Sequence, residues 1–419
     1  MCKVAQSILQ LIVGMLCARY LGPSNYGLIN YAKSVVAFMM PVMQLGLDAT
    51  LVQETLNSPE REGEILGTSL AMNLLSALCC MLLVCCFVAV ANPGEKVTLI
   101  VCGLYSLSLL FRALEIIQYW FHGKLQSKYP SWMMLASYVV VSAYKIYLLA
   151  SGKNVYWFAL TSAIEYGVIG VGLLIIYQKQ GTQKLSVSRT MANRLFLRSK
   201  YYILASLMVT SFQNIDHVML KTMIGDAENG IYSAAITSAG VIQFAYCAII
   251  DSARPAILEE KKKDRAKYEK NISRLYCVII YMTLAQSIVF SLLAEPIITV
   301  LYGADYMTSI PVLRVLAWIY GFSFAGTIRN IWILAEGKDN LLWLINLCGV
   351  LANALLNACF IPLWGASGAA FASVLTQIFT NVIMGFIIKD IRPNNRLLIK
   401  GLNPKLLVEM VKELKESKQ

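Results

Sequence analysis

Apolar runs of membrane-spanning length recur along the whole chain, and only short polar connections separate them. An α-helix needs about 20 apolar residues to cross the ~30 Å hydrocarbon core of a bilayer. The runs occupy residues 4–21, 27–52, 66–91, 97–121, 130–150, 155–177, 202–224, 230–252, 275–301, 309–334, 340–362 and 366–389. Because no soluble domain fits between them, the pattern predicts an all-α membrane protein of about twelve transmembrane helices.

Composition supports this prediction. Hydrophobic residues make up 58% of the 419 residues and charged residues 14%, and the mean hydropathy is +0.61. These values exceed what the core of a soluble domain requires, so most helices must face lipid. The formal net charge of +12 would suit a nucleic acid. The basic residues lie in short connections where no basic groove can form, however, so we expect no nucleic-acid partner.

Cysteine and histidine give no sign of a cofactor or metal. Almost all of the eleven cysteines lie inside apolar runs, without the spacing of metal ligands. The two histidines, His122 and His217, stand in no catalytic or metal-binding spacing. The sequence therefore predicts no cofactor, no metal and no enzymatic activity.

The first apolar run resembles a signal peptide in one respect only, because Lys3 precedes it. Arg19 and Tyr20 stand where small residues would be needed for cleavage. We therefore interpret this run as a retained first span. It begins only three residues into the chain, so we expect a longer natural N-terminus.

The distribution of Lys and Arg predicts the orientation in the membrane. The connections at 22–26, 92–96, 151–154, 225–229 and 364–366 are short and poor in these residues, so we expect them to face outward. The connections that follow the sixth and eighth spans are rich in Lys and Arg, and we place them in the cytoplasm together with both termini. The connection between the second and third spans is acidic, although this orientation places it in the cytoplasm. Carboxylates have little influence on orientation, however, because it follows mainly from Lys and Arg.

Four regions follow from this organisation. We expect an N-terminal six-helix bundle at 1–180, a basic cytoplasmic linker at 181–200, a C-terminal six-helix bundle at 201–390 and a cytoplasmic amphipathic tail at 391–419. In the tail, one helical stripe of apolar residues predicts a helix that lies along the inner leaflet. That stripe consists of Leu406, Leu407, Met410, Val411 and Leu414.

An internal repeat relates the two halves. A constant shift of 203 residues carries Gly22 onto Gly225, Gly27 onto Gly230 and Ala32 onto Ala235, and the same shift carries Asp48 onto Asp251. At the turn positions, glycine permits a positive φ between two helices. Halves of six spans each keep the same orientation, which predicts parallel bundles that enclose a central cleft.

Three segments resemble a known family. They read ARYLGPSNYGLINYA at 18–32, NIDHVMLKTMIGDAENGIYSAA at 214–235 and IPLWGASGAAFASVLTQ at 361–377. They resemble the polysaccharide biosynthesis (O-antigen type) flippases of the multidrug/oligosaccharidyl-lipid/polysaccharide exporter superfamily. That superfamily also holds multidrug-and-toxin-extrusion antiporters and the flippase for lipid-linked peptidoglycan precursors.

The resemblance implies a fold and an activity. The fold is two six-helix bundles around a central cavity. The activity is movement of undecaprenyl-pyrophosphate-linked oligosaccharide across the plasma membrane. It further implies membrane lipids as surroundings, with a polysaccharide polymerase and assembly proteins as partners. A cation-coupled antiporter of the same superfamily and a non-transporting scaffold remain alternatives.

Charged residues inside the spans are the candidate site. Each costs at least ~2.5 kcal/mol at the centre of a helix, so it normally faces a cavity or a partner. The cations expected to bind pyrophosphate or anionic sugar groups in the cleft are Arg19, Lys33, Arg112, Lys145, Lys221, Arg314 and Arg329. Alternatives stay open: snorkelling or interfacial anchoring for several cations, and mutual neutralisation of Arg112 with Glu115, three residues apart on one helix.

Acidic residues are candidates for ion coupling or gating. They are Asp48, Asp216 and Asp251, the last with a possible gate contact to Arg254, and Glu165 is a further acidic candidate. An antiporter would show an acidic, apolar cavity, whereas a flippase would show a cationic one. The excess of cations in the spans favours the flippase.

Overall fold

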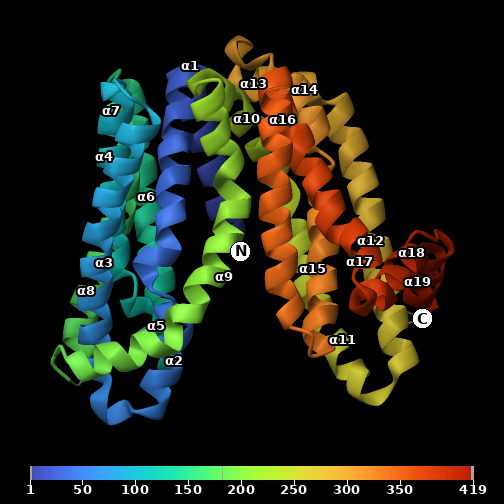
Figure 1. The fold of residues 1–419 in the computed structure, drawn as a ribbon, viewed down its shortest axis with the longest axis horizontal. Helices are drawn as coiled ribbons and strands as arrows, with labels where there is room; N and C mark the ends of the chain where they lie inside the picture. Colours follow the sequence, from blue (N-terminus) through green and yellow to red (C-terminus); the bar gives the residue numbers. More distant parts are fainter. Residues whose placement is uncertain (1, 182, 417–419) are drawn as a thin grey trace. The chain divides into compact units, whose positions relative to one another are not determined.

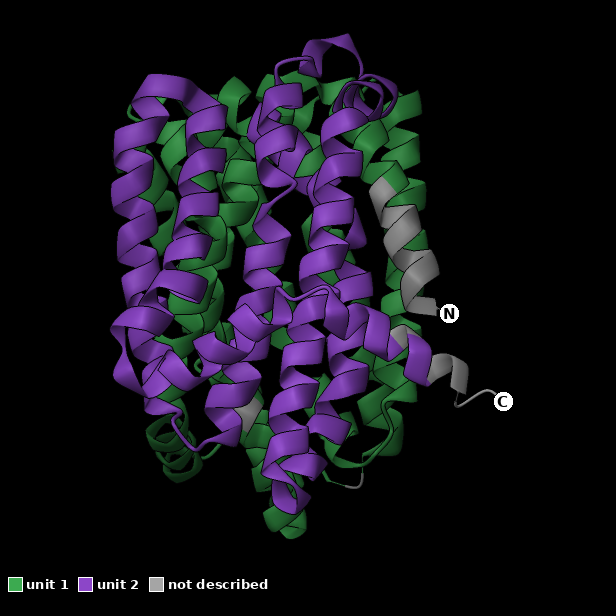
Figure 2. Cartoon of the chain, turned by 90° about the vertical axis from the view of Figure 1, so that its right-hand side faces the viewer, with its two compact units in different colours: residues 1–230 green, residues 231–419 purple. Residues whose placement is uncertain are grey.

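The computed structural model describes residues 2–181 and 183–416, and their side chains except those of residues 2–11, 49, 411 and 414–416. Every element among these residues is a helix (Figure 1). The chain divides into two compact units, residues 1–230 and 231–419 (Figure 2). The structure therefore confirms the predicted all-α class.

The first unit contains a long opening helix followed by shorter ones. Its elements are α1 (Cys2–Gln44), α2 (Leu47–Asn57), η1 (Pro59–Arg61), α3 (Glu62–Ala91), α4 (Lys96–Leu114), α5 (Ile117–Gly123), α6 (Lys128–Ala150), α7 (Val155–Ala159), α8 (Thr161–Gln180) and α9 (Arg189–Met223).

The second unit takes up most of α10 (Asp226–Ala239), which begins in the first. Its other elements are η2 (Gly240–Ile242), α11 (Gln243–Lys263), α12 (Arg265–Leu292), α13 (Ala294–Tyr302), η3 (Ala304–Tyr306), α14 (Ser309–Leu316), α15 (Ile319–Ala335), α16 (Asn340–Ile378), the π-helical turn η4 (Phe379–Ile383), α17 (Met384–Ile387), η5 (Lys389–Ile391), α18 (Arg392–Gly401) and α19 (Lys405–Glu416).

Glycines interrupt the two longest helices. In α16, Gly365 has φ 54° and ψ −130°. The amide of Asn353 nevertheless donates to the hydroxyl of Thr376 at 3.4 Å, although a continuous helix would separate these residues by about 35 Å. The chain therefore reverses at Gly365, within the predicted connection 364–366. Gly22 interrupts α1 in the same way, with φ 69° and ψ 171°.

Eight helices among the described residues are long and apolar enough to cross a membrane. They confirm a multi-pass membrane protein. One of the eight, at residues 340–387, contains the reversal at Gly365. The expected number of about twelve spans remains a prediction.

Hydrogen bonds attach two of the predicted outward connections to the ends of other spans. The hydroxyl of Tyr20 donates to the carbonyl of Lys153 at 3.2 Å, and Lys221 Nζ donates to Glu95 Oε2 at 2.6 Å. Each bond joins the end of one predicted span, at Tyr20 or Lys221, to a predicted outward connection far away in the sequence. The side of the membrane that these connections face remains a prediction.

The repeat is visible in how its glycines pack. A Cβ added to Gly27 would collide with the carbonyl of Asp226, and one added to Gly230 would collide with the carbonyl of Pro23. Pro23 and Asp226 are themselves related by the shift of 203, so the two collisions are equivalent. Gly225 has φ 136°, which, with Gly22, confirms that both turn positions use the left-handed region open to glycine.

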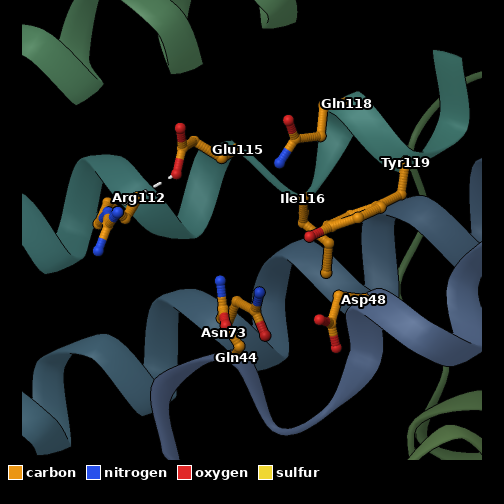
Figure 3. A pocket seen from close by; sticks show the side chains of 8 residues that line it. All are labelled: Gln44, Asp48, Asn73, Arg112, Glu115, Ile116, Gln118 and Tyr119. Atoms are coloured by element: carbon orange, nitrogen blue, oxygen red, sulfur yellow. Dashed lines mark ion pairs between the residues drawn. The ribbon is translucent and has the colours of Figure 1, made fainter. Parts of the chain in front are cut away.

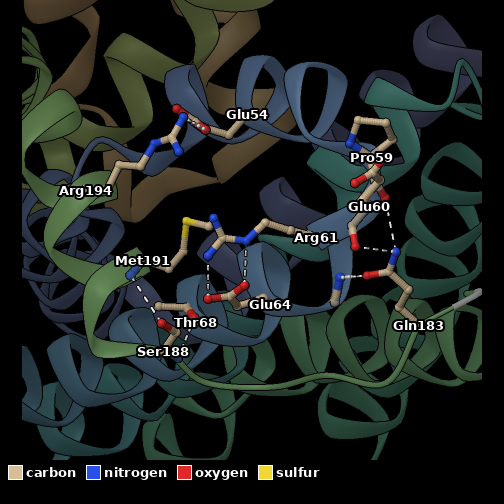
Figure 4. Close-up of polar contacts among 11 residues, drawn as sticks. Glu54, Pro59, Glu60, Arg61, Glu64, Thr68, Gln183, Ser188, Met191 and Arg194 are labelled. Carbon is tan, nitrogen blue, oxygen red and sulfur yellow. Dashed lines mark hydrogen bonds and ion pairs between the residues drawn. The ribbon is translucent and has the colours of Figure 1, made fainter.

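The segment predicted as a cytoplasmic linker, 181–200, is attached to the first unit. The amide of Gln183 donates to the carbonyls of Pro59 and Glu60, and the backbone N–H of Ser188 donates to Thr68 Oγ1 at 3.0 Å (Figure 4). From residue 189 the segment is already part of α9, where Met191 joins the apolar core. The compact units thus divide near residue 230 and not at the expected linker.

The tail is attached to α12 of the second unit, and its position along the inner leaflet remains a prediction. Asn394 of α18 is fully buried and exchanges hydrogen bonds with the hydroxyl of Tyr276 on α12. In α19, Glu413 forms ion pairs with Arg274 and Lys270 of α12. Of the predicted stripe, the side chains of 411 and 414 lie outside the described residues.

Candidate functional site

A small polar pocket lies within the first unit, where α1 to α5 approach one another (Figure 3). It has room for about one water-sized group. Its lining comes from five helices and the junction between α4 and α5. The lining residues are Gln44, Asp48, Asn73, Arg112, Glu115, Ile116, Gln118 and Tyr119.

Two breaks in helical geometry shape the pocket. Between α1 and α2 the chain turns through Leu45 and Gly46, with φ values of 52° and 65°. A positive φ is unusual for leucine, and such strain is commonly stored at functional sites. On the opposite side, α4 ends at Leu114 and α5 begins at Ile117, which sets Glu115 at the junction.

Arg112 is the predicted cation that lies in the pocket. Its Nη2 donates to the hydroxyl of Tyr166 on α8 at 2.6 Å, and its guanidinium lies 4.0 Å from the centre of that ring. Its Nε is 3.7 Å from Glu115 Oε2 and has no hydrogen-bond partner. The pairing with Glu115 that the spacing suggested is therefore present, and Tyr166 fixes the orientation of the guanidinium.

Further charges surround Arg112. Lys33 on α1 interacts electrostatically with Arg112, Lys145 on α6 and Glu165 on α8. Lys33 is exposed and Lys145 is half-buried. The structure thus gathers three predicted cations, Lys33, Arg112 and Lys145, and balances them with Glu115 and Glu165.

Lys221 has a different environment from these three. Its side chain is 3% exposed, and Nζ lies 2.6 Å from Glu95 Oε2 and 3.0 Å from Asp226 Oδ2. The hydrogen bonds that Lys221 and Thr98 donate hold the pKa of Glu95 below its ordinary value. In this arrangement Lys221 joins connections of the first unit, and its ammonium is not open to a ligand.

The remaining cations are not part of this group. Arg19 is exposed on α1. Arg314, on α14 of the second unit, is exposed and donates from Nε to the carbonyl of Ser291 at 3.3 Å. Arg329 on α15 is 3% exposed. Its Nη1 donates to the carbonyl of Thr380 in η4 at 2.5 Å, and no ion pair to Arg329 occurs among the described residues.

The acidic candidates do not lie together in one site either. Asp48 lines the pocket, whereas Asp216 is buried in α9 and already has an interaction partner. Asp251 and Arg254 are exposed on α11. Within the described part of the chain, no ion pair joins Asp251 to Arg254.

Sequence reasoning missed several groups of the pocket. Asn73 lies in the middle of an apolar run, and its polarity there was the only available signal. Gln118 lies near the end of the predicted span 97–121, where polar residues are common, and Gln44 lies within the predicted span 27–52. The sequence pointed to Glu115 only as a neighbour of Arg112, because its place in the same pocket lining as Asn73 depends on how α3 packs on α4.

Comparisons with known proteins agree with this fold. The family described as polysaccharide biosynthesis protein matches residues 1–261. Capsular polysaccharide biosynthesis protein CapF from Staphylococcus aureus is 20% identical over 395 residues, which cover 93% of this chain and 97% of CapF.

Two solved structures share the architecture. The lipid II flippase MurJ, in an inward closed conformation, has a TM-score of 0.72 at 16% identity, over 98% of this chain and 91% of MurJ. An inward-facing multidrug resistance MATE family transporter of the MOP superfamily has a TM-score of 0.67 at 14% identity, over 94% and 96%. At these identities the likeness concerns the fold.

Proposed function

Because the chain belongs to the polysaccharide biosynthesis protein family, we propose that it is a flippase for lipid-linked oligosaccharide. The substrate class is an undecaprenyl-pyrophosphate-linked oligosaccharide, moved from the inner to the outer leaflet of the plasma membrane. In this proposal the protein is a transporter and not an enzyme. The observation that carries it is family membership together with a fold shared with a lipid II flippase.

The physical task explains why such a fold is needed. Each hydroxyl and phosphate oxygen of a headgroup loses its water in hydrocarbon and needs a new hydrogen-bond partner. Cationic side chains supply charge-assisted hydrogen bonds to pyrophosphate, and arginine bonds two oxygens at once. The charges gathered around Arg112 and Lys33 support this role, because intramembrane charges are costly and usually functional.

The mechanism proposed is alternating access. The headgroup enters a central cleft from the cytoplasmic side while its polyprenyl tail stays in lipid. A movement of one bundle against the other then opens the outer side. Both termini lie in the cytoplasm in this scheme, and a polysaccharide polymerase and assembly proteins take up the product.

Deleting the gene and analysing extracted lipids tests the proposal. A flippase predicts accumulation of carrier-linked glycan on the inner leaflet and a fall in surface polymer. Complementation with the wild-type gene should reverse both changes. Unchanged surface glycan together with unchanged carrier-linked glycan would refute the proposal.

A cation-coupled antiporter of the same superfamily is the second candidate. The observation that favours it is the fold shared with a multidrug resistance MATE transporter, together with the balance of acids and cations around Arg112. Altered drug resistance in the deletion strain, with normal surface glycan, would favour this function.

A further inference from the structure

A stripe of basic residues lies on α18, the first helix of the tail. Arg392, Arg396 and Lys400 follow one another at intervals of four residues, so they share one face of the helix. All three side chains are exposed. The Nε of Arg392 donates to the carbonyl of Phe386 at 2.9 Å, but in the part of the chain that the structure describes none of the three forms an ion pair. We call these three residues the basic stripe.

Two other exposed lysines of the second unit provide a contrast, because carboxylates neutralise them. Lys263 pairs with Glu259, one turn before it on α11. Lys267 Nζ lies 2.7 Å from Glu260 Oε1. Asp390, two residues before the basic stripe, already pairs with a lysine between α15 and α16. Since like charges one helical turn apart repel each other, the basic stripe favours an external partner that carries several negative charges.

The opposite face of α18 fixes the position of this helix on α12. Asn394 exchanges hydrogen bonds with the hydroxyl of Tyr276, and a Cβ added to Gly401 would lie 2.7 Å from the Cβ of Tyr276. Asn394 and Gly401 are about 10 Å apart along α18, yet both contact the same residue. The helix therefore crosses α12 and does not run alongside it (Figures 1 and 2), and the basic stripe faces away from α12.

The contacts of α18 also place it at the ends of two predicted spans. The hydroxyl of Tyr281 on α12 donates to the carbonyl of Leu402, directly after α18, at 3.0 Å. Tyr281 lies near the beginning of the predicted span 275–301. In the predicted span 366–389, Ile387 is 62% exposed and lies five residues before α18 begins. Both span ends face the cytoplasm in the predicted orientation, which therefore sets α18 at the cytoplasmic surface of the membrane.

Exposed apolar side chains accompany the basic stripe. Ile399 is 49% exposed and Leu402 is 53% exposed. Helices that lie in a membrane surface combine such apolar residues with Lys and Arg, which anionic lipids attract. Lipid phosphate oxygens accept charge-assisted hydrogen bonds from guanidinium and ammonium groups. A soluble anion would account for the charge of the stripe, but not for its place beside two span ends or for the apolar residues next to it.

We propose that the basic stripe of α18 binds the headgroups of anionic phospholipids in the leaflet that the tail faces. Because the other face of α18 is fixed to α12, the bound lipid holds α12 and the end of the last predicted span at the membrane surface. The proposal concerns the second unit alone. It does not depend on the proposed flippase activity, since lipid binding by the stripe requires no transport.

Native mass spectrometry of the purified full chain in detergent, titrated with phosphatidylglycerol or phosphatidylcholine, tests the basic stripe. We expect the wild type to bind phosphatidylglycerol at least about tenfold more tightly than phosphatidylcholine. Arg396→Gln/Lys400→Gln should lose this preference, because each cation near an anionic surface contributes about fivefold. The matched control, Lys263→Gln/Lys267→Gln, removes the same charge at the same spacing from ion-paired positions. It should keep the preference within about threefold, since salt screens distant charges.

Hydrogen–deuterium exchange of the wild type in lipid nanodiscs locates the bound lipid. The backbone amides of α18 should exchange more slowly in discs that contain phosphatidylglycerol than in discs of phosphatidylcholine alone, because bound headgroups oppose local opening of the helix. High salt should remove the difference, since it screens the attraction. This measurement needs no substitution, so it decides the question even if Arg396→Gln/Lys400→Gln does not give folded protein.

Several results would overturn the proposal. These are equal affinity of the wild type for the two lipids, an unchanged preference in Arg396→Gln/Lys400→Gln, or an equal loss in Lys263→Gln/Lys267→Gln. Equal exchange of the α18 amides in the two kinds of disc would also contradict a lipid partner. If glycerol phosphate slowed that exchange in phosphatidylcholine discs as strongly as phosphatidylglycerol does, the partner would be a soluble anion and the proposal would be wrong.

Discussion

Glu54, near the end of α2, is a buried carboxylate whose partners come from α9. Its side chain is 1% exposed, Arg194 Nη2 lies 3.0 Å from Oε2, and Arg198 donates to Oε1 (Figure 4 shows the pair with Arg194). The two arginine side chains are 42% and 53% exposed, so water can solvate either of them when Glu54 is neutral. We therefore expect a marked asymmetry between removing the arginines and removing the carboxylate.

The burial of Glu54 and the exposure of its partners determine how much stability each change should cost. The double change Arg194→Met/Arg198→Met leaves an unpaired charge buried, which costs about 3–5 kcal/mol. Glu54→Gln leaves two solvated arginines, and the lost hydrogen bonds cost about 1–2 kcal/mol. For a unit of about 230 residues, 1 kcal/mol corresponds to roughly 2–4 °C in melting temperature. The expected losses are then about 6–20 °C for the double variant and about 2–8 °C for Glu54→Gln.

Thermal unfolding of the purified protein in detergent at pH 8, followed by tryptophan fluorescence, measures these losses. The decisive variant combines all three changes, because removing the buried charge should recover stability that the double variant has lost. Arg189→Met/Lys184→Met removes two exposed charges from the same segment and serves as the control. A triple variant no more stable than the double variant would refute the reasoning.

Three further predictions concern the backbone, a surface carboxylate and a buried cation. Gly27→Ala should lower the melting temperature by at least ~2 °C, because the added Cβ meets backbone, whereas Gly14→Ala, with open space, should be neutral or stabilising. Since hydrogen bonds from Lys221 lower the pKa of Glu95, their contribution is complete above the ordinary carboxyl pKa and is lost as the pH falls through the lower folded value. The stability difference between wild type and Glu95→Gln should therefore shrink in acid, and a constant difference from pH 3 to 7 would contradict this. Arg329→Lys keeps the charge but loses the planar set of donors and should cost about 1–3 kcal/mol in the same unfolding assay; an unchanged melting temperature would show that those bonds contribute little.

The sequence contained enough information for the class of fold. Apolar runs of spanning length leave a chain no alternative to membrane helices, because an unpaired backbone in lipid is too costly. The turns at glycines were also predictable, because they depend on local backbone conformation. Gly22, Gly225 and Gly365 adopt backbone angles that other residues rarely reach, so their positions in short connections predicted the turns.

The candidate site was predictable only in part. Arg112, Lys33, Lys145 and Asp48 were selected because charge is costly in a membrane, and in the structure Arg112 and Lys145 both act electrostatically on Lys33. The same argument selected Lys221, whose ammonium is already paired with two carboxylates. The energetic cost of a charge inside the membrane identifies a side chain that needs a partner. It does not reveal whether that partner is a ligand or another residue of the protein.

Composition, the hydrophobic pattern and the glycines of the repeat therefore determined that the chain folds into membrane helices and where it turns. Both properties depend on residues that are near one another in the sequence. Tertiary structure decided which charges meet. The rotation and packing of each helix set whether a polar side chain faces a neighbour, lipid or a pocket, and that choice depends on residues far away in the chain. Asn73 illustrates this, because only the packing of α3 against α2 and α4 turns one polar residue in an apolar run into part of a site.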